Sequence, residues 1–389
     1  MTAEPRTTEP RETDPPSGDD EPTTGSVLPT PDEATIASVS DEPLPPVAPT
    51  TRADRGDELV VMHDVSRKFD NRLVVRGIDL AVPRGTILGI IGPSGAGKTT
   101  TIRMLTGALA PSSGEVRVLG REPRRFRRRD REQIGYMPQQ FTLYEDLTAG
   151  ENVDFVASLF GMLWRRRRKR VQEVLKVVDL WDARGRRAGR LSGGMQRRLE
   201  LACALVHEPE LMILDEPTAG IDPLLRGTIW EELHRLRDAG RTLLVTTQHV
   251  SEAEECDAVA MIVSGEIIAL ATPEELRRIA TNGDLLDIET ATGFDGSDLM
   301  GSPGVGEVTQ ESPHHFRVVV DDAGSALPTI VERIRSAGVE VESASEHRLS
   351  FDEIFAILVS RHDAEKGAQA GTAEKGGPSD AGDSSEAAA

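Results

Sequence analysis

The stretch that decides the fold is Gly92-Pro-Ser-Gly-Ala-Gly-Lys-Thr99. It follows the apolar run Thr86–Ile91, and a helical pattern continues over Thr99–Leu109. The stretch matches G-x-x-x-x-G-K-[ST], a phosphate-binding loop placed between a strand and a helix. Glycine lets the backbone curl until successive N–H groups face inward, where the positive end of the helix dipole also favours an anion.

Lysine and threonine at the end of this loop complete the predicted phosphate site. Lys98 would bring a positive charge to the β and γ phosphates, the Thr99 hydroxyl could ligate Mg²⁺, and Thr100 could contact the α-phosphate side. A chance glycine turn is the alternative, expected at roughly the one per cent level. The residues predicted to bind phosphate are Gly92, Ser94, Gly95, Ala96, Gly97, Lys98, Thr99 and Thr100.

A second chemical motif is Leu211-Met-Ile-Leu-Asp-Glu216, an apolar strand that ends in two carboxylates. Ligands of α/β folds bind at the carboxyl ends of the strands, so this pair is expected at the same edge as the glycine-rich loop. Asp215 is predicted to hold Mg²⁺, and Glu216 to act as the general base towards an attacking water. The alternative is an ordinary solvated strand end.

Apolar patterning predicts two folded parts. Residues 58–282 alternate short apolar runs with helical patterns, which indicates a mostly parallel α/β sheet. Residues 283–361 change rhythm and predict a small α+β domain. The expected elements are strands at Leu59–Met62, Thr86–Ile91, Leu211–Leu214, Thr242–Thr246, Leu285–Ile288, Phe316–Val320 and Val339–Val341, and helices at Met195–Leu205, Leu224–Ala239, Leu327–Ala337 and Phe351–Val359.

Composition bounds the function. The 389 residues carry a net charge of −20, which argues against a general nucleic-acid binder. Much of that charge lies in residues 1–57, which hold 13 acidic residues and 11 prolines, and in residues 362–389; both segments are predicted to be disordered. Two cysteines, Cys203 and Cys256, exclude a disulfide framework and are expected to be buried and inert. Without an apolar run near ~18 residues, we expect a cytoplasmic chain whose membrane role comes through a partner.

A third motif lies between the first two, at Leu191-Ser-Gly-Gly-Met-Gln-Arg-Arg198. It strongly resembles the signature of the ATP-binding cassette (ABC) ATPases. The order of further residues is similar to that family: Phe69 before the glycine-rich loop, Gln139 in Tyr136-Met-Pro-Gln-Gln140, Asp222 in Gly220-Ile-Asp222, and His249. The resemblance covers residues 58–282 and implies a P-loop NTPase core with a helical subdomain.

The family resemblance assigns roles to these residues. It implies that Ser192, Gly193 and Gly194 of one subunit close over the phosphate loop of a second copy, giving a head-to-tail dimer with ATP at the contact. Phe69 would stack on adenine, Gln139 would sense Mg²⁺ and water, Asp222 would communicate across the dimer, and His249 would contact the γ-phosphate. The alternatives are a core aromatic for Phe69 and a structural histidine for His249. Gln248 and Ile221 depart from the usual pattern beside the histidine and the aspartate.

The single loop and single signature indicate one nucleotide-binding subunit, and two cysteines cannot supply zinc modules. What remains within the family is transport with a separate polytopic membrane permease, at the inner face of the membrane. The stretches at 139–148 and 349–358 resemble those of daunorubicin and multidrug exporter ATPases, which implies efflux of a drug, lipid or polymer. The alternative is a soluble ATP-gated dimer clamp, and for the C-terminal domain a plain stabilising extension.

Two arginine-rich runs, 124–129 and 164–170, precede the signature. The simpler interpretation is a solvated helix face. The other is contact with anionic lipid headgroups beside the permease, where each basic residue could contribute ~1 kcal/mol.

Overall fold

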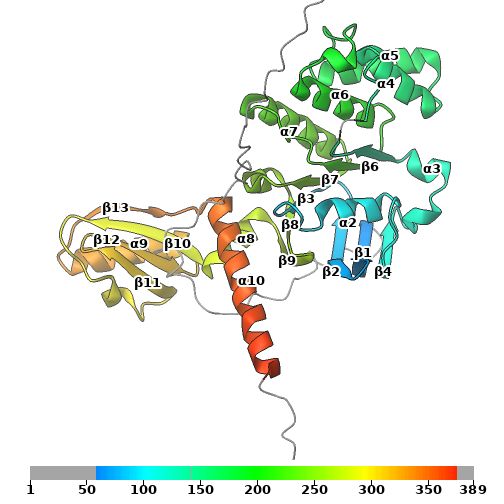
Figure 1. The fold of residues 1–389 in the computed structure, drawn as a ribbon. Helices are drawn as coiled ribbons and strands as arrows, with labels where there is room; N and C mark the ends of the chain where they lie inside the picture. The colour runs from blue at the N-terminus through cyan, green and yellow to red at the C-terminus, as the bar shows by residue number, and fades with distance from the viewer. Residues whose placement is uncertain (1–57, 141, 375–389) are drawn as a thin grey trace, which may run out of the picture.

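The computed structural model describes residues 58–140 and 142–374, with side chains placed as far as residue 367 (Figure 1). The predicted N-terminal tail, residues 1–57, lies outside the described residues, as do residues 375–389. Among the described residues, no helix combines the length and the apolar character needed to cross a bilayer.

A six-stranded sheet forms the centre of the larger part, and all its strands run parallel except the last. Its strands, in spatial order, are β5 (Ile134–Met137), β6 (Leu211–Asp215), β7 (Thr242–Thr247), β3 (Ile87–Ile91), β8 (Ala258–Val263) and β9 (Glu266–Ala271). Every residue of β3, β6 and β7 is buried, as expected of strands covered on both faces. The predicted α/β fold is therefore confirmed.

The first described strand belongs to a different sheet from the one expected. β1 (Glu58–Phe69) lies between β2 (Arg72–Pro83) and β4 (Ser113–Val118) in a separate antiparallel sheet. Two residues, Asp70 and Asn71, join β1 to β2, and only antiparallel neighbours can be connected so briefly. The apolar run Leu59–Met62 is therefore part of a strand, as predicted. The short turn after that strand, which makes it antiparallel to β2, was not predicted.

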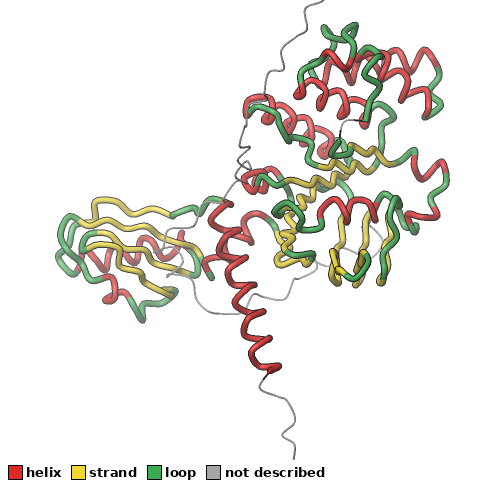
Figure 2. Tube along the Cα trace, viewed as in Figure 1, coloured by secondary structure: helices red, strands yellow, loops and turns green. Residues whose placement is uncertain are grey.

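Helices cover both faces of the central sheet (Figures 1 and 2). Alternate residues of β3 face opposite ways: Leu88 and Ile90 pack with α2 and the antiparallel sheet, whereas Ile87 and Ile91 pack into the larger core. A helical group of α4, α5 and α6 packs together near β5 and β6. The helices of this part are α2 (Lys98–Leu105), α3 (Arg128–Arg131), α4 (Ala149–Leu159), α5 (Trp164–Val177), α6 (Gly193–Leu205), α7 (Pro223–Asp238) and α8 (Pro273–Thr281), with 3-10 turns η1 (Pro123–Arg125), η2 (Ala188–Arg190) and η3 (Val250–Glu255).

The helix after the phosphate loop ends earlier than predicted, at Leu105 rather than Leu109. Gly107 follows with φ of +77°, and a Cβ there would lie 2.6 Å from the carbonyl oxygen of Pro123. The left-handed backbone stops the helix where the apolar spacing alone would have continued it.

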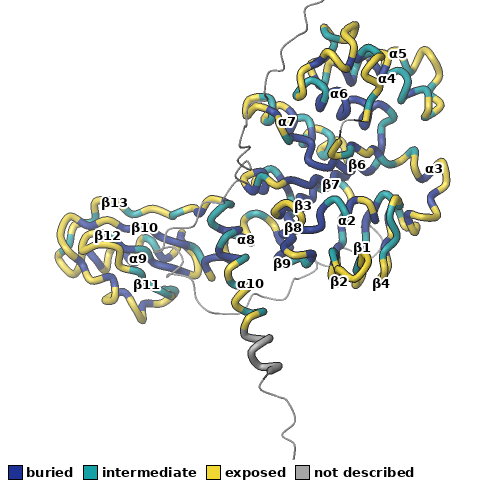
Figure 3. The backbone as a smooth tube through the Cα atoms, viewed as in Figure 1, coloured by how far each residue is buried: buried dark blue, intermediate teal, exposed yellow. Residues whose placement is uncertain are grey.

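The smaller part is an antiparallel sheet in the order β11-β12-β10-β13, with α9 on one face, as the predicted α+β domain requires. Its elements are β10 (Asp284–Thr290), η4 (Gly296–Leu299), β11 (Val305–Ser312), β12 (His315–Val320), α9 (Ala323–Ser336) and β13 (Val341–Glu346). The last helix, α10 (Phe351–Glu374), follows them, and its buried side chains belong to the core of the larger part. Buried residues of the sheet and of α9 form one apolar core, and Figure 3 marks buried residues along β10, β12 and α9.

α10 extends well beyond the predicted helix Phe351–Val359, so residues 362–374, which were predicted to be disordered, continue it. It packs against η3, α8 and β9 of the larger part. The Arg361 guanidinium donates to the carbonyls of Ile279 and Ala280, each at 2.8 Å, at the end of α8. These hydrogen bonds hold the helix beyond its apolar segment, a contribution that apolar spacing does not reveal.

Candidate active site

The glycine-rich loop lies between β3 and α2, as predicted. Gly92 has no room for a side chain, because a Cβ there would meet the carbonyl oxygen of Ile262 at 2.1 Å. Gly97 caps α2 with φ of +109°, a conformation that L side chains rarely adopt. The loop therefore leaves its N–H groups at the start of a helix, which favours bound phosphate.

Lys98 is buried at the base of this loop. Its Nζ donates to the carbonyl oxygens of Gly92 at 2.6 Å and Pro93 at 3.2 Å, and lies 3.9 Å from Oε1 of Glu216. Burial lowers the pKa of Lys98, and the carboxylates of Glu216 and Asp215 oppose that shift. The ammonium group is thus poorly solvated, which strengthens its attraction to an incoming phosphate.

The two carboxylate oxygens of Asp215 differ in their hydrogen bonding. Its Oδ1 accepts the Thr246 hydroxyl at 2.6 Å and lies 3.5 Å from the Thr99 hydroxyl, whereas its buried Oδ2 has no hydrogen-bond partner. A buried carboxylate oxygen without a partner, beside a threonine hydroxyl, fits a magnesium site. No group of three or more His, Cys, Asp or Glu in the described chain could hold a metal by itself. Mg²⁺ here would therefore take remaining ligands from water and phosphate.

Glu216 is fixed by its main chain. Its N–H donates to the carbonyl and the hydroxyl of Thr246, at 3.1 and 3.0 Å, and its φ is +53°, in the left-handed region. Gln139, just after β5, donates its amide Nε2 to Oε2 of Glu216 at 2.9 Å. The predicted base and the predicted sensing glutamine are therefore in direct contact.

The signature residues lie apart from the phosphate loop of the same chain. Ser192 caps α6 by accepting the Met195 N–H at 3.4 Å, and Ser192 and Gly193 are exposed. Asp222 likewise caps α7 by accepting the Leu225 N–H at 3.1 Å, and it is also exposed. Both capped helix starts are available to a second molecule.

Phe69 ends β1 and is 39% exposed. Its ring carries the Arg67 guanidinium at 4.6 Å from the centroid, so one face is covered. Phe69 pairs with Arg72, which lines a cavity of about 430 Å³ along the outer side of the phosphate loop, together with Ser94 and Gly95. The aromatic residue is thus next to a cavity that touches the loop, and its stacking on adenine stays a prediction.

His249 is another predicted residue that does not bond to the cluster of Lys98, Asp215 and Glu216. Among the described residues, no hydrogen bond or ion pair joins its ring to Glu216, and its main-chain N–H donates to the Thr247 hydroxyl at 3.0 Å. Gln248 accepts the Ser94 hydroxyl at 3.2 Å and so contacts the phosphate loop in its place. The role of His249 stays a prediction.

Two residues of this site were missed. Thr246 bonds both Asp215 and Glu216, and Arg197, in α6, contacts the main chain of both. The only signal for Arg197 was a charged residue on the buried side of a helical pattern. Cys203 and Cys256 are buried, as predicted, and burial raises the pKa of both thiols.

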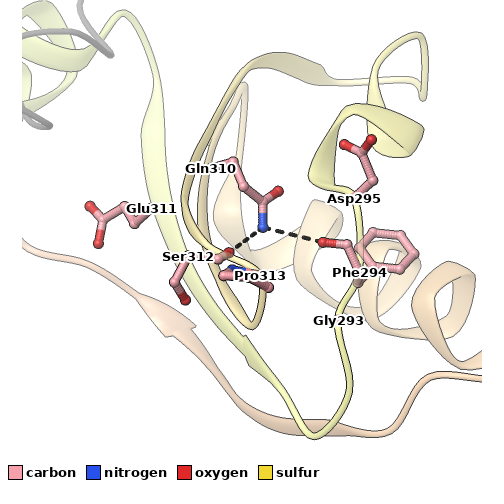
Figure 4. A pocket seen from close by; sticks show the side chains of 7 residues that line it. All are labelled: Gly293, Phe294, Asp295, Gln310, Glu311, Ser312 and Pro313. Carbon is pink, nitrogen blue, oxygen red and sulfur yellow. Dashed lines mark hydrogen bonds between the residues drawn. The ribbon is translucent and has the colours of Figure 1, made fainter.

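A separate cavity of about 540 Å³ lies in the smaller part, at the turn between β11 and β12 and beside Phe294 (Figure 4). The side-chain Nε2 of Gln310 donates hydrogen bonds to the carbonyl oxygens of Phe294 and Ser312, at 3.2 and 2.5 Å. None of the residues predicted to bind ATP or Mg²⁺ lines this cavity.

Family models match two segments. A model described as "ABC transporter" matches residues 75–219, and "ATP-binding protein DrrA1-3-like, C-terminal domain" matches residues 272–359. The second match therefore includes α8 as well as the smaller sheet.

Curated relatives are similar over most of the folded chain. Daunorubicin resistance ATP-binding protein DrrA3 of Streptomyces coeruleorubidus is 34% identical over 78% of this chain and 96% of its own length. Daunorubicin/doxorubicin resistance ATP-binding protein DrrA of Streptomyces peucetius is 37% identical over 79% of this chain and 92% of its own. Probable multidrug ABC transporter ATP-binding protein YbhF of Escherichia coli is 34% identical over 64% of this chain, which spans only 43% of that relative.

Solved structures of ABC transporter ATP-binding subunits have a similar fold. One titled "Structure of ATP binding subunit of ABC transporter" has a TM-score of 0.53 at 28% identity, covering 57% of this chain and 92% of its own. The cassette MJ0796, titled as a dimeric post-hydrolysis state bound to ADP and Pi, has a TM-score of 0.52 at 27% identity, covering 55% and 98%.

Proposed function

The chain belongs to the ABC transporter ATP-binding family, and from this premise we propose that it binds and hydrolyses ATP as the motor subunit of an exporter. The observation that carries the proposal is one cluster of side chains from three separate segments. Lys98 and Thr99 of the phosphate loop meet Asp215 and Glu216 after β6, and Gln139 after β5 contacts Glu216.

Each side chain of the cluster has a chemical task. Lys98 binds the β and γ phosphates, and the loop N–H groups hold their oxygens. Thr99 and Asp215 would hold Mg²⁺, which neutralises charge on the phosphates when bound. Glu216 accepts the proton of the attacking water, and the Gln139 amide keeps that carboxylate oriented.

Two copies of the chain are proposed to share two ATP molecules. The exposed helix starts at Ser192 and Asp222 support this arrangement, because among the described residues no hydrogen bond or ion pair joins either side chain to the phosphate loop. The solved relative titled as dimeric supports it further. Ser192, Gly193 and Gly194 would close over the partner's nucleotide, and ATP hydrolysis would release the dimer.

The proposed membrane partner is a separate polytopic permease, with this subunit peripheral at the inner face of the membrane. The names of the relatives, which include daunorubicin and multidrug resistance, favour drug, lipid or polymer efflux as the cargo class. No observation favours the alternative of a dimer clamp without transport.

Contact with anionic lipid is a further part of this proposal, and it concerns α5. Three arginines of the run are in ion pairs within the chain: Arg166 with Glu208, Arg167 with Asp154, and Arg170 with Glu173. Arg165 and Arg168 are exposed and would provide the lipid contact, whereas the exposed Lys169 also lies 3.7 Å from Glu173. Flotation with anionic and with zwitterionic vesicles tests this, and equal recovery would contradict it.

The main experiment is phosphate release from ATP by the purified chain, alone and with its co-expressed permease, with and without Mg²⁺. We expect Mg²⁺-dependent release, and co-purification of the permease in mild detergent. Absence of release under both conditions would refute ATP hydrolysis, and release without a co-purifying membrane protein would refute only the transport partner.

A further inference from the structure

Arg197 is a buried cation one helical turn after Gly193 and Gly194, the glycines that begin α6. It is only 7% exposed, and it lies between the segment after β5 and the segment after β6. A buried guanidinium is costly unless its donors are bonded and its charge is paired. Both Nη atoms of Arg197 are bonded, whereas its buried Nε has no hydrogen-bond partner among the described residues. The contacts of the Arg197 guanidinium therefore identify the chain segments that it holds in place.

The guanidinium binds four main-chain carbonyl oxygens. Its Nη1 donates to Pro138 at 2.8 Å and Gln139 at 3.1 Å, and its Nη2 donates to Asp215 and Glu216, both at 2.6 Å. Three of these carbonyls belong to the proposed sensing glutamine Gln139, the proposed metal ligand Asp215 and the proposed base Glu216. The fourth belongs to Pro138, the residue before Gln139. One planar group thus bridges two segments far apart in sequence.

Glu200 supplies the charge partner. Its Oε2 accepts from Nη1 of Arg197 at 2.9 Å, and its Oε1 accepts the main-chain N–H of Thr142 at 3.1 Å. Burial raises the pKa of Glu200, and Arg197 opposes that shift. The pair therefore also holds the chain just after Gln139.

We propose that Arg197 is a positioning residue for ATP hydrolysis, which holds the main chain on both sides of the Gln139–Glu216 hydrogen bond. The inference rests on the proposed function, since it assigns a task within that reaction. Lysine cannot replace arginine here, because a single ammonium lacks the fixed fork that reaches four carbonyls in two directions. Since Arg197 lies in α6, the position of the base is also tied to the helix that starts with the signature.

The test compares Arg197→Met and Arg197→Lys with Arg198→Met. Arg198 is the matched control: it is the next residue of the same helix and is buried, but its Nη1 bonds Val178 and Asp179. We expect both Arg197 variants to lose about 100-fold in kcat, the cost of a misplacement near 1 Å. Their Kd for ATP, measured by fluorescence titration, should stay within about threefold, because the phosphate loop is untouched. Arg198→Met should keep kcat within about threefold whatever its melting temperature.

A second variant keeps the test decisive if Arg197→Met folds poorly. Arg197→Met with Glu200→Met replaces a buried ion pair by apolar side chains of similar length, which buried pairs often tolerate. This double variant should fold and still lose about 100-fold in kcat. A folded double variant with wild-type kcat overturns the inference.

The Glu216→Gln background separates positioning from general damage. If Arg197 acts by placing the base, then Arg197→Met should lower single-turnover hydrolysis there by less than about threefold. A full 100-fold further loss would overturn the inference, because the effect would then not pass through Glu216. Wild-type chain without any turnover would instead refute the proposed function itself, so the two failures are distinguishable.

Discussion

Exchanging Glu216 for glutamine removes the proton acceptor while keeping the shape of the side chain. Glu216 is 8% exposed, and its Oε2 accepts the Gln139 amide at 2.9 Å. The carbonyl oxygen of a glutamine can accept that same hydrogen bond, and the main-chain N–H contacts to Thr246 do not involve the side chain. The substitution therefore changes the chemistry with little change in structure.

A general base contributes about 10²–10⁴-fold to a rate, so kcat should fall by that factor, or about 3–5 kcal/mol in activation free energy. ATP should still bind, since Lys98 keeps its hydrogen bonds to the loop carbonyls of Gly92 and Pro93 and loses only the 3.9 Å ion pair with Glu216, and a long-lived ATP-bound dimer should accumulate. Phosphate release measures the first effect and light scattering after gel filtration the second. Glu232→Gln is the control, because that carboxylate bonds Arg235 on α7 and lies outside the cluster. Turnover of Glu216→Gln within threefold of wild type, or a variant that stays monomeric with ATP and Mg²⁺, would refute the reasoning.

Three further substitutions test the site. Lys98→Ala should abolish most nucleotide affinity and hydrolysis because the buried charge at the phosphates is lost; unchanged binding in a fluorescence titration would contradict the assigned role. Gly92→Ala should destabilise the fold by about 1–3 kcal/mol, because its Cβ would lie 2.1 Å from the Ile262 carbonyl, and an unshifted urea midpoint would count against this. Thr246→Val should cost about 1.5–3 kcal/mol of stability, since it removes the 2.6 Å hydrogen bond to Asp215, and should change the Mg²⁺ concentration needed for half-maximal turnover; a variant with both values unaltered would argue against that contact.

Motifs with a fixed spacing were predicted well from the sequence, because their chemistry requires local geometry. The loop from Gly92 to Thr99 and the strand ending in Asp215 both lie where they were expected. The family resemblance singled out Gln139 and the strand-end motif singled out Glu216, but the hydrogen bond between them, across 77 residues of sequence, was not predicted.

Contacts between segments far apart in the sequence were harder to predict. The antiparallel sheet around β1 depends on a two-residue turn, and α10 continues to Glu374 partly through Arg361, whose partners lie 81 and 82 residues earlier. Arg197 is one of two adjacent arginines, and its helical spacing indicates only the buried side of the helix, whereas the fold packs its guanidinium against carbonyls. Contacts to main-chain atoms leave no trace in the identity of the partner residue, so sequence patterns could not reveal them.

The left-handed backbone at Glu216 puts the thermal stability of the fold in conflict with the rate of ATP hydrolysis. A non-glycine residue with φ of +53° costs about 1–2 kcal/mol relative to the ordinary helical region. Glycine would relieve that strain, so selection for heat resistance alone would favour losing the carboxylate from this position. A laboratory evolution experiment that rewards only survival on heating should therefore enrich inactive chains altered at this residue, whereas a selection that also demands export should retain the strained glutamate.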